Sequence, residues 1–282
     1  MTIRIGCDPE LFAYDKGRKQ FVSVHGMLSG NKQHPVKVPK GAVQVDGTAA
    51  EFNIDPAETR EQFLFNIHHV RKLLEGMVQS KNRDIVLIAK PSVRYPVEYF
   101  ESLSFIEKEL GCEPDVNAYT GEFNVKPNGD STTLRTGAGH VHIQFLKDDK
   151  FYDNPYDRDH ILDCCVLAKQ LDATLYRSSA VWDSDTERST LYGKPGSFRP
   201  KKYGIEYRPL SNAWLNEEWT EAFVYDMTLK VTELFLDGIN VTDKTVRDIT
   251  LDLKGFCQDM KSLGLPSVLE YCPEGYATYK VA

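Results

Sequence analysis

The chain has 282 residues, of which 41% are hydrophobic and 27% are charged, the proportions of a globular protein with a sizeable core. No stretch approaches the ~20 consecutive apolar residues of a transmembrane helix, so we expect no membrane association. The formal net charge of -7 argues against a broad basic face for nucleic acid, although it is compatible with a local basic pocket.

The first half of the chain is predicted to contain three strands and two helices. Alternation of polar and apolar residues predicts strands over 2–14 and 42–54. At Asp55 a capping sequence begins, and the helix after it has one apolar stripe formed by Phe63, Ile67, Val70, Leu74 and Met77. A buried strand is predicted over 84–89 and a short helix over 99–110.

The second half begins with an irregular stretch and ends in helices. The predicted elements are an irregular stretch over 114–137, a strand over 140–145, a helix over 156–176, a polar loop over 183–202, a strand over 203–210, and helices over 216–237 and 243–262. Unequal spacing between the strands favours an α+β fold over a regular βαβ repeat. Without a linker or repeat, we expect one domain over 1–282, with 216–282 as a helical C-terminal extension. No dinucleotide-binding or P-loop motif occurs.

Four predicted strands each place two polar side chains on one face. The pairs are Asp8 and Glu10, Glu51 and Asn53, His140 and His142, and Glu206 and Arg208. If the four strands share one sheet, several carboxylates and imidazoles crowd together, and like charges repel unless a cation lies between them. This predicts a metal site. The alternatives are a solvated sheet face and, for the two histidines, a structural hydrogen-bonded pair.

A basic segment lies beside the Glu206 strand in an otherwise acidic chain. It contains Gly193 and Gly196 in its loop and six cations, namely Arg188, Lys194, Arg199, Lys201, Lys202 and Arg208. Glycine lets a backbone approach an anion closely, and a guanidinium matches phosphate oxygens in a bidentate manner. The segment is therefore predicted to bind phosphate, with a solvated basic loop as the alternative. Metal-binding carboxylates beside a phosphate site are what magnesium and ATP require.

Five sequence segments in a fixed order give a more specific indication. They are residues 6–12 (GCDPELF), 45–53 (VDGTAAEFN), 111–115 (GCEPD), 135–143 (RTGAGHVHI) and 203–212 (YGIEYRPLSN). Together they resemble the phage-type carboxylate-amine ligases, the type 2 amidoligases, which share the glutamine synthetase-like and glutamate-cysteine ligase-like fold. One departure is Glu113, where the pattern has aspartate. The resemblance covers about residues 3–215, and the C-terminal part contributes nothing to it.

The resemblance implies a curved antiparallel sheet, a half-barrel backed by helices, with ATP and two or three Mg²⁺ ions at its concave face. By motif, the metal ligands would be Glu10, Glu51, His140 and Glu206. Arg199 and Arg208 would contact the transferring phosphoryl group. Further contacts to the nucleotide would come from Arg135, His142, Arg188 and Lys194.

The implied reaction is ATP-dependent ligation of a carboxylate to an amine through an acyl phosphate. Asp46 or Asp115 could accept the proton of the amine, and a turn at Gly47 and Thr48 would be needed to bring Asp46 to the site of Glu51. The expected partners are a small-molecule or peptide carboxylate and amine, and not nucleic acid or membrane. The first residues lack the pattern of a signal peptide, so we expect a cytoplasmic protein, in the host cytoplasm if a phage encodes it.

Three other functions remain open at this point. A guanidino phosphotransferase on the same fold would use the same acids and arginines but form no amide. A non-catalytic phage protein could retain the fold. A zinc hydrolase could be built on His140 and His142, although no third histidine or cysteine ligand stands out.

Overall fold

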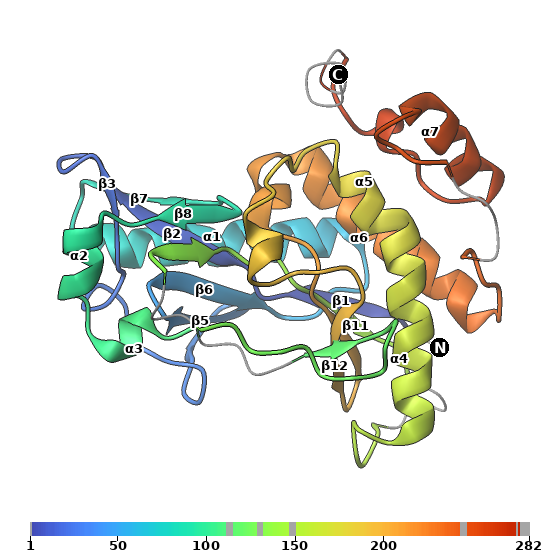
Figure 1. Ribbon diagram of the computed structural model, residues 1–282, viewed down its shortest axis with the longest axis horizontal. Coiled ribbons are helices and arrows are strands. Elements are labelled where there is room, and N and C mark those ends of the chain that lie inside the picture. The colour runs from blue at the N-terminus through green and yellow to red at the C-terminus, as the bar shows by residue number, and fades with distance from the viewer. Residues whose placement is uncertain are drawn as a thin grey trace.

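The computed structural model describes residues 2–110, 115–128, 132–146, 151–242, 247–274 and 276 (Figure 1). The strands lie in two antiparallel sheets and a short two-stranded ribbon, and helices cover them. The α+β class expected from the sequence is therefore confirmed. Across the described ranges, no helix is both long enough and apolar enough to cross a membrane. Residues 111–114 lie outside the described ranges, and with them most of the GCEPD segment, including Glu113.

The first sheet has five strands. Their order is β1 (Arg4–Cys7), β11 (Val141–Gln144), β13 (Gly204–Tyr207), β12 (Ser197–Lys201) and β9 (Val116–Asn117). In this register Glu206 lies opposite His142 on one side and opposite Arg199 on the other. The sheet thus places a carboxylate between an imidazole and a guanidinium on three neighbouring strands.

The second sheet has six strands and continues from the first. Its order is β3 (Gln20–Val22), β2 (Glu10–Asp15), β6 (Ala49–Ile54), β5 (Gly41–Asp46) and β4 (Val36–Val38), with β7 (Ile85–Ile88) also paired to β2. The chain passes from β1 through Asp8 and Pro9 into β2, so Asp8 and Glu10 lie where the two sheets meet. A hydrogen bond from the amide of Glu10 to the carbonyl oxygen of Ala138 (2.9 Å) fixes this junction. The ribbon pairs β8 (Ser92–Arg94) with β10 (Leu134–Thr136).

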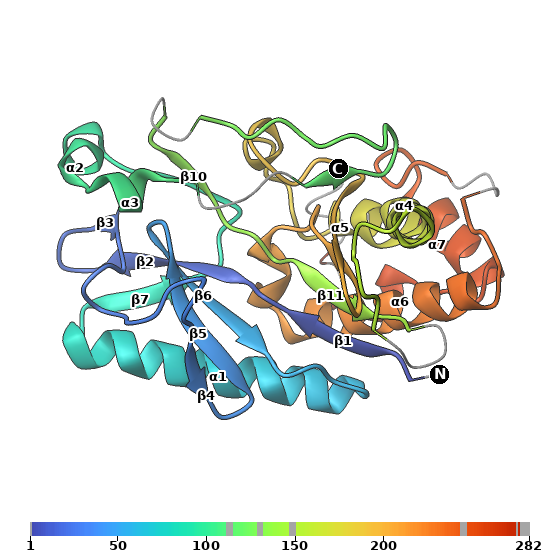
Figure 2. The ribbon, with the colours of Figure 1, turned by 90° about the horizontal axis from the view of Figure 1, so that it is seen from below.

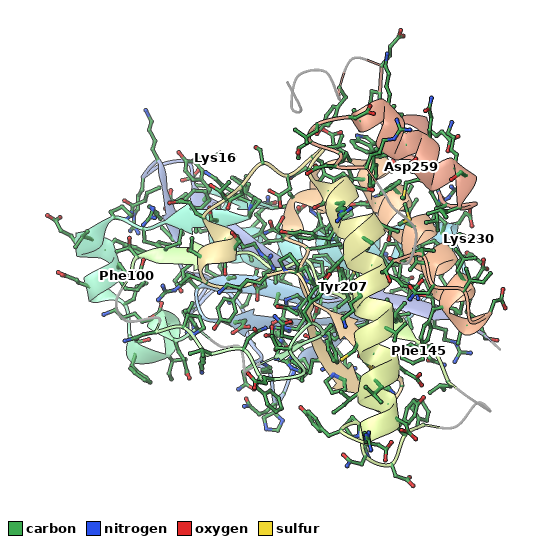
Figure 3. All side chains as sticks on the ribbon, turned by 45° about the vertical axis from the view of Figure 1, so that its right-hand side comes forward. Lys16, Phe100, Phe145, Tyr207, Lys230 and Asp259 are labelled. Atoms are coloured by element: carbon green, nitrogen blue, oxygen red, sulfur yellow. The ribbon has the colours of Figure 1, made fainter. Side chains whose placement is uncertain are left out.

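Three long helices lie against the sheets, namely α1 (Arg60–Lys81), α4 (Arg158–Leu171) and α6 (Glu218–Leu236). Figure 2 shows α1 and α6 along the same side of the strands. They meet through aromatic side chains, since the ring of Phe63 on α1 lies 5.3 Å from that of Tyr225 on α6. Phe63 also lies 6.2 Å from Trp214, which precedes α6. Phe145, at the end of β11, lies 5.9 Å from the ring of His160 on α4 (Figure 3). These contacts pack the helices against the strands.

Shorter helical segments complete the described chain. They are α2 (Val97–Ser102), α3 (Phe105–Lys108), the π turn η2 (Asp172–Tyr176), α5 (Arg177–Ser179), the 3₁₀ turns η3 (Arg188–Thr190), η4 (Asn212–Asn216) and η5 (Val268–Glu270), and α7 (Leu253–Ser262). Phe256 and Met260 of α7 are buried in the same hydrophobic core as the sheets. The single-domain organisation over 1–282 stays a prediction.

Several predicted boundaries differ from the structure. The expected strand 42–54 is a hairpin of β5 and β6, and α1 is capped by Thr59 rather than Asp55 because the intervening residues continue a sheet-like path in which Ala57 bridges to Ile5. The expected helix 99–110 is divided between α2 and α3, because Leu103 and Ser104 take extended conformations. The polar loop 183–202 ends in strand β12. Of the helix expected over 243–262, the described part becomes α-helical at Leu253.

Candidate functional site

Glu10, Asp46 and Glu51, here called the acid cluster, come together where β2, β5 and β6 meet. Glu10 and Glu51 are paired residues on adjacent strands. The β5–β6 hairpin turns at Gly47 and Thr48, with Gly47 at φ 54°, where glycine avoids the strain of a side chain. One carboxylate oxygen from each acid lies within 4.8 Å of the others. The turn that the sequence required to bring Asp46 beside Glu51 is therefore present.

In the acid cluster Glu10 and Glu51 are buried and Asp46 is half-buried, and few hydrogen-bond donors lie around them. Glu10 Oε2 accepts a hydrogen bond from the amide of Ala138 (2.8 Å), and Glu51 Oε2 accepts one from the side chain of Gln44 (2.7 Å). Burial, with Asp46 nearby, raises the pKa of Glu10 to about 8. Burial and the neighbouring acids also raise the pKa of Glu51 and contribute to a raised pKa of Asp46. Three oxygen donors that resist ionisation without a counter-charge fit a hard cation such as Mg²⁺.

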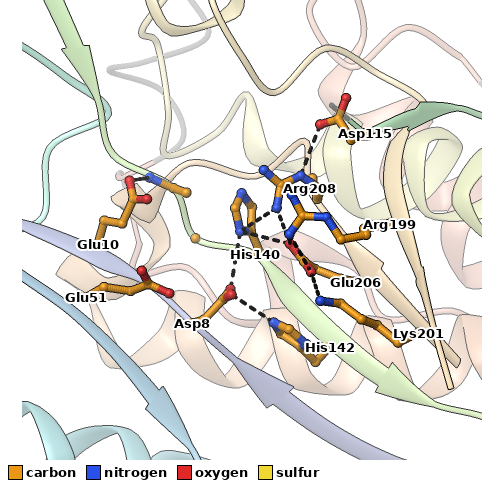
Figure 4. A network of polar contacts seen from close by, with 12 residues as sticks. Asp8, Glu10, Glu51, Asp115, His140, His142, Arg199, Lys201, Glu206 and Arg208 are labelled. Carbon is orange, nitrogen blue, oxygen red and sulfur yellow. Dashed lines mark hydrogen bonds and ion pairs between the residues drawn. The ribbon is translucent and has the colours of Figure 1, made fainter. Parts of the chain in front are cut away.

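Asp8 lies between two histidines at the junction of the sheets (Figure 4). Its carboxylate oxygens lie 3.3 Å from His140 Nδ1 and 3.1 Å from His142 Nε2. Burial alone would raise the pKa of Asp8, but the two imidazoles outweigh it and hold this pKa well below its ordinary value. For His142, burial is outweighed by Asp8, so its pKa is raised. Burial and Arg208 lower the pKa of His140 to about 4, which leaves this imidazole neutral and able to bind a metal.

Asp8, His140 and Glu206 form a second group whose ligand atoms lie within 4.8 Å of one another. Asp8 and Glu206 place two carboxylates beside the neutral imidazole of His140. A cation between the two carboxylates would relieve the repulsion of their like charges. The second group also fits a metal, although by a mixed set of nitrogen and oxygen donors.

Three cations surround Glu206 on the side away from the acid cluster (Figure 4). Arg208 forms a short ion pair with it, Lys201 Nζ lies at 2.6 Å and Arg199 at 3.2 Å. Burial would raise the pKa of Glu206, but Arg208 and Lys201 hold it well below its ordinary value. Arg208 also contacts Asp115 at 3.0 Å. We call this set the Glu206 network, formed by Glu206, Arg208, Lys201, Arg199 and Asp115.

Two hollows open on either side of these groups. Pocket A is narrow, with a cavity volume of about 40 Å³, and is lined by residues that include Glu10, Asp46, Asp115, His140, Arg188 and Arg208. Pocket B, with a cavity volume of about 380 Å³, is lined by residues that include Asp8, Glu51, His142, Arg199, Lys201 and Tyr203. The paired residues Glu10 and Glu51 thus line different pockets. Groups bound in A and B would meet at the acids.

Three other residues that the sequence predicted to contact the nucleotide line pocket A or a pocket beside it. Arg135 and Arg188 line pocket A, but their guanidinium groups donate to main-chain carbonyl oxygens, such as those of Leu134 (2.7 Å) and Pro209 (2.6 Å). Lys194 lines a separate hollow beside pocket A, together with Asp115. The nucleotide contacts of these three residues stay predictions.

Two participants were not chosen as site residues from the sequence. Asp8 was recognised only as the strand partner of Glu10, yet it contacts both histidines. Lys201 was named only as one of six cations in the predicted phosphate-binding loop. It lies two residues after Arg199 on β12, so that both side chains point to Glu206. A strand over 197–201 would have given this alternation, but the glycines and prolines around it favour a loop.

Comparisons with known proteins give limited information. No protein-family model and no curated protein matches this sequence. Among solved structures, the chain is similar to a cryo-EM structure of glutamine synthetase from Plasmodium falciparum, with 11% sequence identity and a TM-score of 0.43. The similarity covers 87% of this chain and 52% of that chain, so this chain spans about half the length of its neighbour. A likeness this distant does not by itself assign a family or an activity.

The acid cluster predicts a pH-dependent effect of Mg²⁺. Because the folded pKa of Glu10 is about 8, above its ordinary 4.5, the folded protein keeps a proton that the unfolded chain loses. Without metal, this residue's contribution to stability therefore falls as pH rises from about 4.5 to about 8. Mg²⁺ should offset this loss, so the increase in Tm on adding Mg²⁺ should grow with pH over that window.

Thermal unfolding with Mg²⁺ or with EDTA, at about pH 5.5 and about pH 8.5, measures this effect. Glu51→Gln should remove the growth with pH, whereas the exposed Glu61→Gln should retain it. An equal Mg²⁺-induced shift at both pH values in the unmodified protein would contradict a metal site at these acids.

Proposed function

We propose that this protein is an ATP-dependent ligase that joins a carboxylate to an amine through an acyl phosphate. The observation that carries the proposal is the buried acid cluster lying beside the cations of the Glu206 network, with a pocket on each side. The order of the five sequence segments supports the same reaction. A carboxylate is a poor electrophile, and phosphorylation gives it a leaving group, which is why ATP is needed.

The acids and histidine of the two groups would hold the metal ions. Glu10, Asp46 and Glu51 offer one set of oxygen ligands, and Asp8, His140 and Glu206 offer a second. When bound, Mg²⁺ would neutralise charge on the phosphate oxygens and polarise the transferring phosphoryl group.

Charge favours the nucleotide in pocket B and the carboxylate substrate in pocket A. Pocket B is lined by four cations, Arg4, Lys32, Arg199 and Lys201, and by the ring of Phe151, which is 62% exposed. These groups suit phosphates and a base. In pocket A, the buried Nε of Arg188 donates no hydrogen bond to any described residue and could bind a carboxylate.

The reaction would proceed in two steps. A carboxylate oxygen attacks the γ-phosphorus of ATP, the bond to ADP breaks, and Arg199 with Arg208 stabilises the charge on the phosphoryl group in transit. The amine then loses a proton and forms a bond to the acyl carbon, while phosphate leaves with the electron pair of the broken C–O bond. Asp115 suits the role of base better than Asp46, because Asp46 belongs to the acid cluster.

The test is turnover of Mg-ATP with a panel of carboxylates paired with a panel of amines. The ligase reaction should release one inorganic phosphate for each amide formed, and Glu51→Gln should abolish both. A stable phosphorylated guanidine without phosphate release would instead support the phosphotransferase. Nucleotide binding without turnover of any pair would support a non-catalytic protein. Either result would overturn the proposal.

A further inference from the structure

A third hollow, pocket C, adjoins pocket A. Its cavity volume is about 290 Å³, and it shares Asp115, Tyr192 and Gly193 with pocket A. Asp115 is 6% exposed and lies at the inner end of pocket C, where it contacts Arg208 of the Glu206 network. A group bound in pocket C at Asp115 would therefore face the site at which the proposed acyl phosphate forms.

The polar groups at the inner end of pocket C are ordered by hydrogen bonds. The side-chain amide of Asn124 donates to Asp115 Oδ1 (2.7 Å) and to Ser197 Oγ (3.2 Å), while Arg208 Nε donates to Asp115 Oδ2 (3.0 Å). Each carboxylate oxygen has a second lone pair, so Asp115 can still accept a hydrogen bond from an ammonium group.

The rim of pocket C carries the opposite charge. Lys194 is exposed and forms no ion pair with any described residue, and Lys126, whose side chain is 43% exposed, lies 3.8 Å from Glu109. Glu122 is the one acid among the exposed lining residues. Pocket C therefore has a negative charge at its buried end, from Asp115, and positive charges at its exposed end, from Lys126 and Lys194.

Apolar side chains form part of the same lining. Phe123 is 59% exposed and Val125 is 92% exposed, and both belong to the segment that follows β9. Large apolar groups exposed beside a polar pocket are typical of ligand-contact surfaces. They would contact a side chain of moderate size.

We propose that pocket C is the acceptor subsite and that the amine substrate is an α-amino acid or the amino end of a short peptide. This inference rests on the ligase function proposed above. The ammonium group would bind Asp115, the carboxylate would bind Lys194, and the side chain would contact Phe123 and Val125. Asp115 accepts a proton from the ammonium group, the nitrogen lone pair forms the bond to the acyl carbon, and the C–O bond to phosphate breaks.

Binding can be located without turnover by measuring how fast Lys194 is acetylated, using mass spectrometry. The probes are the protein L-amino acids and a set of dipeptides, without ATP. At least one probe should slow acetylation of Lys194 by about tenfold, equivalent to occupancy near 90%. Lys72, exposed on α1 and outside all three pockets, should react at an unchanged rate.

Matched derivatives and variants test the proposed orientation by calorimetry. The N-acetylated form of the best probe and its carboxamide should each bind at least about tenfold more weakly. Lys194→Met should weaken binding of the amino acid but not of its carboxamide. Asp115→Asn, which keeps the hydrogen bond from Asn124, should weaken both. Because Asp115 contacts Arg208 and its variant could fold poorly, the surface variant Lys194→Met decides the matter independently.

The two proposals can fail separately. If no probe protects Lys194, or if Lys194→Met binds the amino acid as tightly as the unmodified protein, the subsite assignment is wrong. If one phosphate is released for each amide formed, and Lys194→Met does not change the KM for the amine, the ligase function is supported and the assignment of pocket C as the acceptor subsite is wrong. If probes protect Lys194 as expected but no pair of carboxylate and amine is turned over, the binding site in pocket C is supported and the ligase function is wrong.

Discussion

Replacing Arg208 by methionine should lower the free energy of unfolding by about 3 kcal/mol, the lower end of the cost of removing one partner from a buried ion pair. The side chain of Arg208 is 3% exposed, and the side chains of its partners Glu206 and Asp115 are 1% and 9% exposed. Without Arg208, Asp115 keeps the hydrogen bond from Asn124 but loses the cation that contacts it, and Glu206 keeps the cations of Arg199 and Lys201. Denaturant unfolding measures the change.

The matched control is Lys230→Met on α6. Lys230 forms an ion pair with Glu233 at 3.0 Å, with both side chains 43% exposed. Exposed pairs contribute about 1 kcal/mol or less, so this variant should remain close to the unmodified protein. If Arg208→Met lost no more stability than the control, the Glu206 network would not be the buried charge network described here.

Arg199→Ala should slow the proposed reaction by about 10²–10³-fold, the usual cost of removing a donor aimed at charge that develops in the transition state. Its contacts with the Glu206 carboxylate are long, 3.2 and 3.3 Å, and its side chain is 14% exposed. A guanidinium with contacts of this length to Glu206 can form shorter bonds to a phosphoryl group in transit. Nucleotide affinity should therefore change much less than the rate.

Single-turnover kinetics together with nucleotide titration separate these two effects. Arg83→Ala, an exposed arginine between α1 and β7, serves as the control and should leave both quantities unchanged. Equal losses in rate and in nucleotide affinity for Arg199→Ala would show that this residue only binds the nucleotide.

Much of the site could be predicted because local periodicity determines which side chains share a face. The alternation in 140–145 correctly placed His140 and His142 together, and both contact Asp8. The turn at Gly47 and Thr48 followed from the spacing of Asp46 and Glu51. Both predictions depend only on residues close together in the sequence, whose side-chain directions are set by local backbone geometry.

The features that sequence reasoning missed depend on contacts between distant segments. The metal site was predicted for the case in which the four polar strand pairs share one sheet. In the structure, the chain passes at Asp8 and Pro9 from one sheet into another, and hydrogen bonds to Ala138 and His140 fix that junction. The guanidinium groups of Arg135 and Arg188 donate to main-chain carbonyl oxygens, and no periodicity in the sequence indicates such bonds.

The fate of the carboxylate oxygen tests the central claim most directly. With a substrate pair that turns over, the carboxylate is labelled with heavy oxygen, and the released phosphate is analysed by mass spectrometry. If an acyl phosphate forms, the amine displaces phosphate from the acyl carbon, so one labelled oxygen should appear in phosphate for each amide. Amide formation with unlabelled phosphate would contradict the acyl-phosphate route.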